Sequence, residues 1–324
     1  MILIVTNAED PEADTVIDFL KEDKTEYWRF NTEDFPEKVK ASFKLGEGEF
    51  LPPDGRVIPF SSITSAWYRR PEDSRFQALL TPEAIEFARM ETRALLFGIW
   101  RTINCFWVSH PDNIRIAESK PLQLQVASSL GLEIPQTIIT NDSEKVKRFC
   151  KDFGGDIIVK PIRRGYVEFK NKEGMPDVLS IFTNRVTPEA MREIDSLVYA
   201  PAIFQPYILK AFELRIAVVG TEVLACRIDS QESEFTRDDW RRYDFEHTPH
   251  SVFELPQRIE ILCVELVNKL KLAFGAIDMI VTPDNRYVFL EINPNGHWLW
   301  IEELTGLPIA RSMATLLERR VEAR

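Results

Sequence analysis

Two apolar segments near the C-terminal end constrain the fold most, because they can pair with each other in few ways. AIDMIVT (276–282) and YVFLEIN (287–293) are separated by Pro-Asp-Asn-Arg, a sequence typical of the turn in an antiparallel hairpin. If residue 282 pairs with residue 287, Asp278 lies directly opposite Glu291. Side chains alternate along a strand, so Asp278, Glu291 and Asn293 are expected on one face. The core-facing set is then expected to be Ile277, Met279, Val281, Val288, Leu290 and Ile292.

Two carboxylates placed opposite each other repel unless a cation lies between them. Two carboxylates and an amide are hard oxygen ligands of the kind that Mg²⁺ takes, with water and substrate phosphates completing its shell. The pattern therefore predicts a magnesium site formed by Asp278, Glu291 and Asn293. The alternative is a solvated hairpin face, where acidic residues are common and an error of one residue in register separates the pair.

Lys120 and Lys160 add positive charge near the ends of predicted elements. Lys160 ends the apolar strand DIIVK (156–160), and Lys120 begins a helix after Ser119. Each has the simpler interpretation of a solvated charge. Together with the dicarboxylate hairpin they favour a nucleoside triphosphate, because its phosphates need cationic hydrogen-bond donors and Mg²⁺ together. The glycine-rich phosphate loops GxxxxGK[ST] and GxGxxG are absent from the sequence.

The 324 residues are enough for two or three cores, and the order of elements predicts a mixed α/β (α+β) fold. ILIVT (2–6), a short helix and a second strand open the chain like a βαβ unit. The predicted domains are an N-terminal α/β domain at 1–115, a short central unit at 116–204 and a C-terminal unit at 205–324 that carries the hairpin. Two polar, weakly periodic segments, 161–178 and 231–254, are expected to be the least ordered.

Composition limits the partners of the chain. The net charge of −11 argues against binding to nucleic acid or to an anionic membrane, and no apolar run approaches the ~20 residues that span a bilayer. Cysteines occur at positions 105, 150, 226 and 263 without paired spacing, which predicts reduced thiols rather than disulfides or a zinc site. The expected location is therefore the cytoplasm, and a homodimer is left open.

Five segments in chain order resemble the ATP-grasp superfamily: SKPLQLQVASSLGLEIPQT, DIIVKP, FQPYILKAFELRIAVVG, GAIDMIV and FLEINPNGHW. The resemblance covers the chain from about residue 116 onward. SAWYRRP (65–71), IDSQ (228–231), DWRR (239–242) and NPNGHWLWIEELTGLPI resemble more closely the graspetide, or microviridin-type, maturases, which are ATP-grasp ligases that macrocyclise ribosomal peptides. This resemblance extends to the whole chain, and it implies an ATP-grasp fold after a pre-ATP-grasp domain.

The resemblance also implies roles for individual residues in binding ATP and Mg²⁺. Lys120 and Lys160 would contact phosphates, and Glu213 would face the ribose. The adenine hinge would consist of Gln205, Tyr207 and Ile208, and the magnesium ligands would be Asp278, Glu291 and Asn293, with Asn293 also beside the nucleotide. Arg215, Arg227 and Lys160 are the residues expected to assist catalysis. The lid, which is usually glycine-rich, keeps only Gly165 and Gly174 here and has Arg163 and Arg164 instead.

The implied chemistry is transfer of a phosphoryl group from ATP to an Asp or Glu side chain. A Thr or Ser hydroxyl then attacks the acyl phosphate to form an ω-ester, or a Lys amine attacks it to form an ω-amide. The substrate would be a precursor peptide with a leader and an acidic core. Local cations must hold an acidic core on an acidic protein, and the candidates are Arg69, Arg70, Arg227, Arg241 and Arg242. A helix that starts at Thr187, with Glu189 and Glu193 exposed, is a candidate surface for the leader.

Two alternatives use the same nucleotide site. One is a ligase that joins a free amino acid to a peptide or small acid. The other is a module that binds ATP without turnover, although a mere binder would have little need for two lysines and a full set of metal ligands. His297 lies between Gly296 and Trp298, and it is not assigned a catalytic role. Trp298 and Trp300 are expected to be packing residues.

Overall fold

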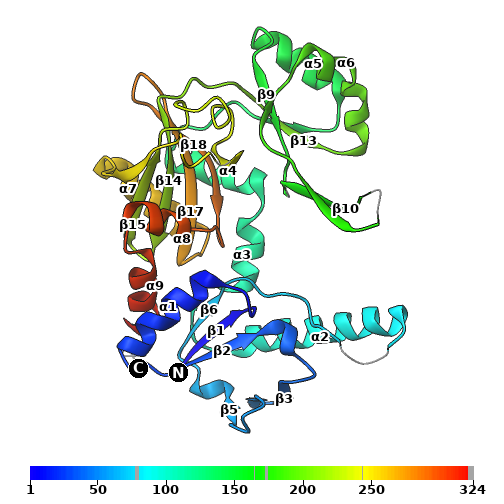
Figure 1. The fold of residues 1–324 in the computed structure, drawn as a ribbon, viewed down its shortest axis with the longest axis vertical. Helices are drawn as coiled ribbons and strands as arrows, with labels where there is room; N and C mark the ends of the chain where they lie inside the picture. Colours follow the sequence, from blue (N-terminus) through cyan, green and yellow to red (C-terminus); the bar gives the residue numbers. More distant parts are fainter. Residues whose placement is uncertain (77–79, 164, 172–173, 243, 320–324) are drawn as a thin grey trace.

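The computed structural model describes residues 1–76, 80–163, 165–171, 174–242 and 244–319 (Figure 1). The N-terminal part contains a parallel sheet in the order β2-β1-β6-β7. Its strands are β1 (Ile2–Thr6), β2 (Tyr27–Asn31), β6 (Ser65–Tyr68) and β7 (Phe106–Val108). A small antiparallel sheet next to it consists of β3 (Lys40–Lys44), β4 (Glu47–Leu51) and β5 (Ile58–Pro59). The helices are α1 (Pro11–Glu22) and α2 (Pro82–Thr102), each with proline in its first turn and a side-chain cap, from Asp10 and Thr81 respectively.

Strand β1 is buried at all five positions because both faces of its sheet are covered. Ile2 and Ile4 pack in a cluster with residues of α1 and of the C-terminal helix, whereas Leu3 and Val5 pack in an aromatic cluster that includes Trp100 of α2. The apolar run that opens the chain is therefore correctly predicted to be a strand without a solvent face.

Two short helices lead to the central part of the chain, α3 (Pro111–Ala117) and α4 (Lys120–Leu130). Helix α4 ends at Gly131, which has the left-handed φ of +88° that glycine adopts at little cost. The central sheet has the order β12-β9-β13-β8 and is antiparallel throughout. Its strands are β8 (Ile138–Thr140), β9 (Ile157–Lys160), β12 (Asn184–Arg185) and β13 (Ala202–Pro206), and its helices are α5 (Ser143–Asp152) and α6 (Pro188–Arg192).

Of the segment 161–178, expected to be among the least ordered, residues 164, 172 and 173 lie outside the described residues. The others contribute to an antiparallel hairpin of β10 (Tyr166–Lys170) and β11 (Pro176–Ser180). Figure 1 shows this hairpin reaching from the central sheet toward the outer end of α2. The other such segment, 231–254, contains the 3-10 turn η4 (Trp240–Arg242) and the strand β16 (His250–Phe253).

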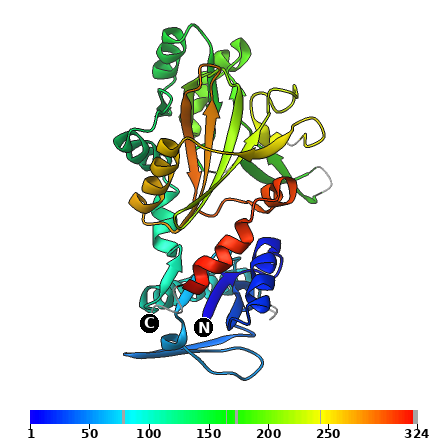
Figure 2. The ribbon, with the colours of Figure 1, turned by 90° about the vertical axis from the view of Figure 1, so that its left-hand side faces the viewer.

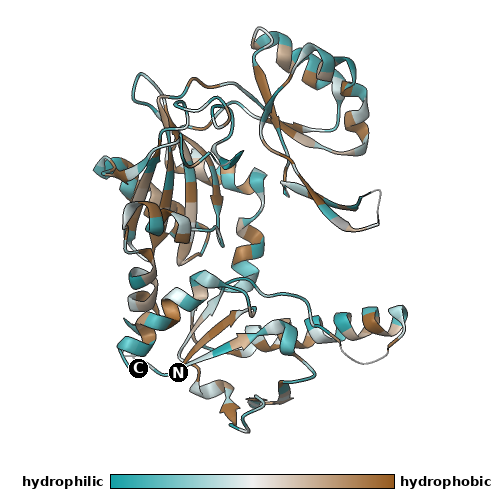
Figure 3. Ribbon diagram, in the orientation of Figure 1, coloured by the Kyte–Doolittle hydropathy of each residue, from teal (hydrophilic) through white to brown (hydrophobic). Residues whose placement is uncertain are grey.

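The C-terminal sheet is antiparallel, in the order β16-β15-β14-β17-β18. Besides β16 it contains β14 (Phe212–Val219), β15 (Glu222–Ile228), β17 (Phe274–Val281) and β18 (Tyr287–Asn293). Helices α4 and α7 (Gln257–Lys269) contribute to the core on one face. Helices α8 (Leu299–Thr305) and α9 (Ile309–Arg319) pack on the other face, and α9 lies between this sheet and α1 (Figure 2). Apolar residues, drawn in brown, occur along much of these strands (Figure 3).

The second face of the C-terminal sheet is only partly covered, and this positions the site. Ala217 and Ala276 pack in the cluster formed with α8 and α9. Two residues farther along each strand, on the same side of the sheet, Arg215 and Asp278 lie opposite each other. Polar groups therefore occupy this face beyond the region that the helices cover.

The predicted register of the hairpin is right at its functional end and wrong at its turn. Asp278 pairs with Glu291 as predicted, but Val281 pairs with Tyr287, and the register shifts between Asp278 and Met279. The turn takes one residue more than expected, and a bulge at Leu290 restores the predicted pairing. Leu290 therefore lines a cavity instead of the core, and Phe289 is buried in its place. Of the predicted core set, Ile277, Met279, Val281 and Ile292 are in the core cluster, and Val288 is buried.

No helix in the described part of the chain is long and apolar enough to cross a membrane. All four cysteines are free thiols, as expected from their spacing.

Candidate active site

The carboxylates of Asp278 and Glu291 lie side by side on neighbouring strands, with the Asn293 amide next to both. Asn293 Nδ2 is 3.1 Å from Glu291 Oε1 and 3.4 Å from Asp278 Oδ2. Burial raises the pKa of Asp278, and Glu291 adds to this effect while Arg215 opposes it. Burial also acts to raise the pKa of Glu291, but the charges of Lys120, Lys160 and Arg241 outweigh it, so that this pKa is lowered. The pair is thus asymmetric, with Glu291 the more firmly ionised member.

Arg215 fixes the position of Asp278. Its Nη1 lies 2.9 Å from each oxygen of that carboxylate, and its Nη2 donates to the His297 carbonyl at 3.0 Å. The guanidinium passes so close to the backbone that a Cβ on Gly296 would lie 2.6 Å from Arg215 Nη2 and 2.6 Å from Ala276 Cβ. The glycine of the sequence NPNG is therefore required by close packing at the site.

Lys120 contacts the carboxylate pair, and Lys160 lines the same cavity as the pair. Lys120 Nζ is 2.7 Å from Glu291 Oε2. Helix α4, which carries Lys120, is fastened to β18 by Gln123, whose amide donates to the Ile292 carbonyl at 2.8 Å and accepts from the Ile292 N–H at 3.2 Å. Lys160 ends β9 on the opposite wall, where burial lowers its pKa to about 8. The structure therefore brings both predicted lysines to the predicted metal ligands.

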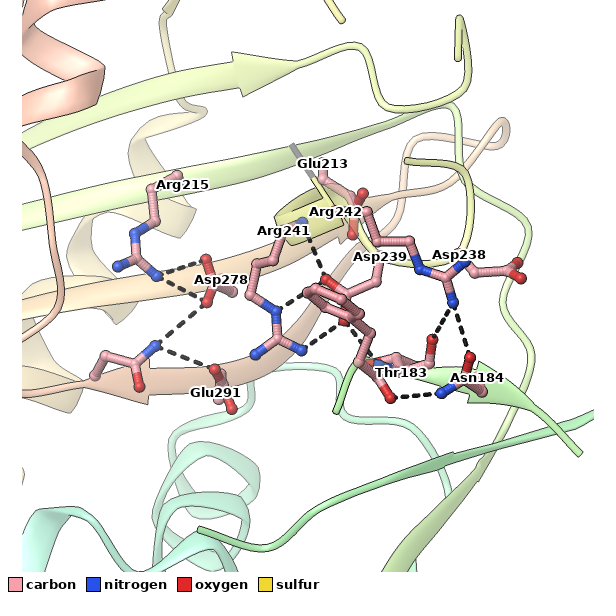
Figure 4. Close-up of polar contacts among 12 residues, drawn as sticks. Thr183, Asn184, Glu213, Arg215, Asp238, Asp239, Arg241, Arg242, Asp278 and Glu291 are labelled. Carbon is pink, nitrogen blue, oxygen red and sulfur yellow. Dashed lines mark hydrogen bonds and ion pairs between the residues drawn. The ribbon is translucent and has the colours of Figure 1, made fainter. Parts of the chain in front are cut away.

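Arg241 approaches the same carboxylates from η4 (Figure 4). Asp239 holds its guanidinium, with distances of 2.8 Å to Nε and 2.6 Å to Nη2. Asp239 also accepts the Thr183 N–H at 2.8 Å, and Arg242 donates to the Asn184 side chain at 2.8 Å. Hydrogen bonds of the 239–242 segment therefore connect the C-terminal sheet to β12 of the central sheet. The same segment places the Arg241 guanidinium close to Asp278 and Glu291.

A cavity lies between the central and C-terminal sheets. One end holds Asp278 and Glu291, and the other is lined by Gln205, Tyr207 and Ile208. These three residues are the predicted adenine hinge. The remaining lining residues are Pro135, Ile158, Lys160, Thr183, Pro206, Lys210, Glu213, Asp238, Asp239, Trp240, Arg241, Ile280 and Leu290. The lining combines apolar and charged side chains, which suits the base and the phosphates of a nucleotide.

Two side chains in the wall of this cavity, Gln205 and Glu213, are held by contacts with other residues. Gln205 is buried and donates to Thr137 Oγ1 at 2.9 Å, so its amide supports the hinge from within. Glu213 pairs with Lys210 at 3.0 Å, and both side chains are 5 % exposed. Burial raises the pKa of Glu213, with Lys210 opposing the shift. Sequence reasoning missed Lys210, although an isolated lysine between two buried strands was a signal that could have identified it.

A second, larger and more open cavity adjoins the first, and both include Trp240, Arg241, Asp278 and Glu291 in their walls. It extends toward the N-terminal domain. Its further cationic and polar lining comes from Arg70, Lys120, Arg163, Tyr166, Arg215 and His297. Arg70 is half-buried, and its Nε has no hydrogen bond. Two chemically different cavities therefore meet at the carboxylate pair.

Some predicted residues are not brought to this cleft. Arg227 pairs across the sheet with Leu214, which belongs to the core on the face opposite Arg215, and it binds Asp229 at 2.7 Å. The structure therefore does not support a catalytic position for Arg227, because strand register turns it to the other face. Arg69 does reach the wall of the larger cavity, but there it is buried in an ion pair with Glu12. Arg164 lies outside the described residues.

The donor set fits Mg²⁺. It offers two carboxylates and one amide, which must rotate so that its oxygen faces the ion, and it leaves room for phosphate and water oxygens. No group of three or more His, Cys, Asp or Glu residues that could hold a metal occurs among the described residues. A metal at this site would therefore depend on Asn293 and on ligands brought by a nucleotide.

Comparison with known proteins supports this interpretation. Residues 1–115 match the MvdD pre-ATP grasp domain, and residues 117–317 match the RimK-like ATP-grasp domain. No curated protein sequence matches the chain.

Among solved structures, the macrocyclase MdnC bound with precursor peptide MdnA, from Microcystis aeruginosa MRC, is 32 % identical with a TM-score of 0.87, over 98 % of this chain and 99 % of MdnC. A RiPP-associated ATP-grasp ligase of Chryseobacterium gregarium, in complex with ADP and a leader and core peptide, is 34 % identical with a TM-score of 0.88, over 98 % and 96 %. The macrocyclase MdnB of the same Microcystis strain is 28 % identical with a TM-score of 0.78, over 98 % of each chain.

Proposed function

We propose that this chain, which belongs to the RimK-like ATP-grasp family, is an ATP-dependent macrocyclase of a ribosomally made precursor peptide. The observation that carries the proposal is the meeting of two cavities at Asp278 and Glu291. A nucleotide in the smaller cavity would point its terminal phosphate into the larger, cationic one. An acidic peptide in the larger cavity would present a carboxylate to that phosphate.

The residues of the chain supply positioning and charge. Mg²⁺, held by Asp278, Glu291 and Asn293, would neutralise phosphate charge. Lys160 and Lys120 would bind phosphate oxygens from the two walls. Catalysis of this kind needs no nucleophilic side chain, because the enzyme aligns two substrates and stabilises the transferring group.

The reaction balances in two steps. A substrate carboxylate oxygen attacks the γ-phosphorus of ATP, so that ADP leaves and an acyl phosphate forms. A Thr or Ser hydroxyl, or a Lys amine, of the same peptide then attacks the acyl carbon, loses a proton and expels inorganic phosphate. Arg215 and Arg241 lie at the junction of the cavities, where they would stabilise the acyl phosphate. Each ring removes one water equivalent from the peptide.

For the peptide we propose two binding regions. The acidic core would occupy the larger cavity beside Arg70, Arg215 and Arg241. The leader would bind on the central unit, where Glu189 and Glu193 are exposed as expected and would attract basic leader residues. The β10–β11 hairpin of the same unit carries the exposed apolar side chains Val167, Phe169, Val178 and Leu179.

We also propose domain boundaries at residues 115 and 204, and a cytoplasmic reaction, in keeping with the four free thiols. A homodimer stays a prediction that light scattering would test.

Mass spectrometry of an acidic precursor incubated with enzyme and Mg-ATP tests the function. Loss of one or more water equivalents within a single peptide supports macrocyclisation. Addition of an amino-acid mass would instead favour the ligase that adds a free amino acid. Binding of ADP without any change in either peptide or ATP would favour the module without turnover.

A further inference from the structure

Glu12 is a buried carboxylate on the N-terminal domain that the proposed chemistry does not use. An acidic residue in the first turn of a helix is usually solvated and complements the positive end of that helix. Glu12 is instead 2 % exposed. Its Oε1 accepts the backbone N–H groups of Trp298 at 2.8 Å and Leu299 at 3.4 Å. A residue of α1 therefore satisfies the first backbone donors of α8, almost three hundred residues later in the chain.

The other carboxylate oxygen of Glu12, Oε2, contacts Arg69 and His297. Oε2 forms the ion pair with Arg69, and it lies 3.0 Å from His297 Nδ1. Arg69 is also buried, and its Nη1 donates to the Asn295 carbonyl at 2.7 Å. The buried pair thus contacts the loop that follows β18 at residues 295, 297 and 298.

This loop connects directly to the proposed chemistry. It begins at Asn293, the third proposed metal ligand, and the His297 carbonyl is the second partner of Arg215. Gly296, between those two residues, already leaves no room for a Cβ beside the Arg215 guanidinium. A shift of the loop would therefore move Asn293 and displace the arginine that orients Asp278.

We propose that Glu12 and Arg69 are positioning residues of the ligase, through which the N-terminal domain holds the 293–298 loop in the geometry that binds Mg²⁺ with the nucleotide. This inference rests on the proposed function. Both charges are buried, so removal of either leaves the other without compensation and forces the loop to rearrange. Partners that orient metal ligands without touching the metal typically change metal affinity or activity by ~10–100-fold when they are altered.

The test uses Glu12→Gln in the full-length enzyme. Its amide keeps the shape and one oxygen for the Trp298 N–H, but it cannot pair with Arg69. Calorimetric titration of ADP binding at increasing Mg²⁺ should show a half-saturating Mg²⁺ concentration ~10–100-fold above wild type. ADP binding without Mg²⁺ should be unchanged. The kcat for peptide should fall in the same range, with KM for peptide unchanged.

Asp14→Asn is the matched control. It makes the same chemical change in the same turn of α1, and Asp14 also pairs with an arginine, Arg29, but at the surface. Arg69→Lys is the second variant, because it keeps the charge but loses the planar guanidinium, whose two terminal nitrogens separately contact Glu12 and the Asn295 carbonyl. The control should match wild type, and Arg69→Lys should raise the Mg²⁺ requirement.

A folded Glu12→Gln enzyme with the Mg²⁺ dependence of wild type would overturn the inference, whether or not its thermal stability falls. The same holds for Arg69→Lys if Glu12→Gln does not fold. Failure of the macrocyclase function is a separate result, since the titration of ADP and Mg²⁺ uses no peptide.

Discussion

The C-terminal sheet and the central sheet form opposite walls of the nucleotide cavity, and they differ in how firmly they are packed. Strands β14 and β17 are buried at all eight positions of each, whereas β8 has no buried residue and β9 has one. The central core is the small cluster Val146, Ile157, Ile194, Leu197 and Phe204. Regions with few buried apolar contacts open more readily. The metal ligands thus lie on the rigid wall, while Lys160 and the hinge lie on the wall that can move.

This difference suggests that the two sheets have different roles in binding the nucleotide. The C-terminal sheet keeps Asp278 and Glu291 in register whether or not a ligand is bound. The central unit can open to admit a nucleotide and then close, helped by the contacts of Asp239 and Arg242 with β12. The predictions below test each wall in turn.

The largest effect on activity is expected from a substitution in the C-terminal sheet, which forms the rigid wall. Glu291→Ala should lower ADP formation by at least ~10³-fold, because it removes a metal ligand and the partner of Lys120. Circular dichroism should show an unchanged fold, since the side chain is not part of the core. Asp284→Ala, an exposed carboxylate in the turn of the same hairpin, is the control and should retain full activity. Normal turnover by Glu291→Ala would remove the metal assignment.

Gly296→Ala should reduce kcat by about 10–100-fold, since a small displacement at the reacting centre costs up to ~100-fold. The added methyl group would meet the Arg215 guanidinium and the Ala276 side chain. Gly98→Ala makes the same change in α2, where the methyl group meets no atom within 4 Å. That control should keep activity and gain about 0.5–1 kcal/mol of stability in thermal unfolding. Equal activity of both variants would show that the packing around Arg215 is unimportant.

On the mobile wall, Lys160 should make nucleotide binding sensitive to alkaline pH. Its pKa is lowered to about 8 by burial, so the free enzyme loses this charge as the pH rises through that value. The dissociation constant of ADP, measured by calorimetry, should be flat below pH 8 and rise by up to ~10-fold per pH unit above it. Lys160→Arg keeps its charge and should abolish the rise. An identical pH profile in this variant would exclude Lys160 as the titrating group.

The smallest effect is expected when the same substitution is made in the core of the central sheet and in that of the C-terminal sheet. Ile157→Val and Ile277→Val each remove one methylene and should each cost about 1 kcal/mol. Ile157→Val should speed amide hydrogen exchange in the central sheet alone, because that core can open separately. Ile277→Val should lower the free energy of global unfolding measured in denaturant. Loss of global stability from both variants in equal measure would show that the two walls unfold together.

Local sequence signals predicted much of the fold because their physics is local. Proline and a capping residue begin both α1 and α2, and Gly131 ends α4, which are signals that the local sequence carries. The pairing of Asp278 with Glu291 was also predictable from side-chain alternation. The bulge at Leu290 was not, because it depends on how the turn fits the strand twist and the core beneath it. The face on which Arg227 lies was not predictable for a related reason, since the sequence of β15 does not show which of its two faces is turned toward the site.

The sequence by itself determined the units of this protein: its strands and helices, the opposed carboxylates and the need for a cation between them. These follow from alternation, capping and charge repulsion over short stretches of chain. Only the tertiary structure decided which distant groups complete the site, above all the burial of Glu12 and Arg69 against the loop after β18. Such contacts join residues more than two hundred positions apart, and their energy depends on removing both charges from water, which no local pattern records.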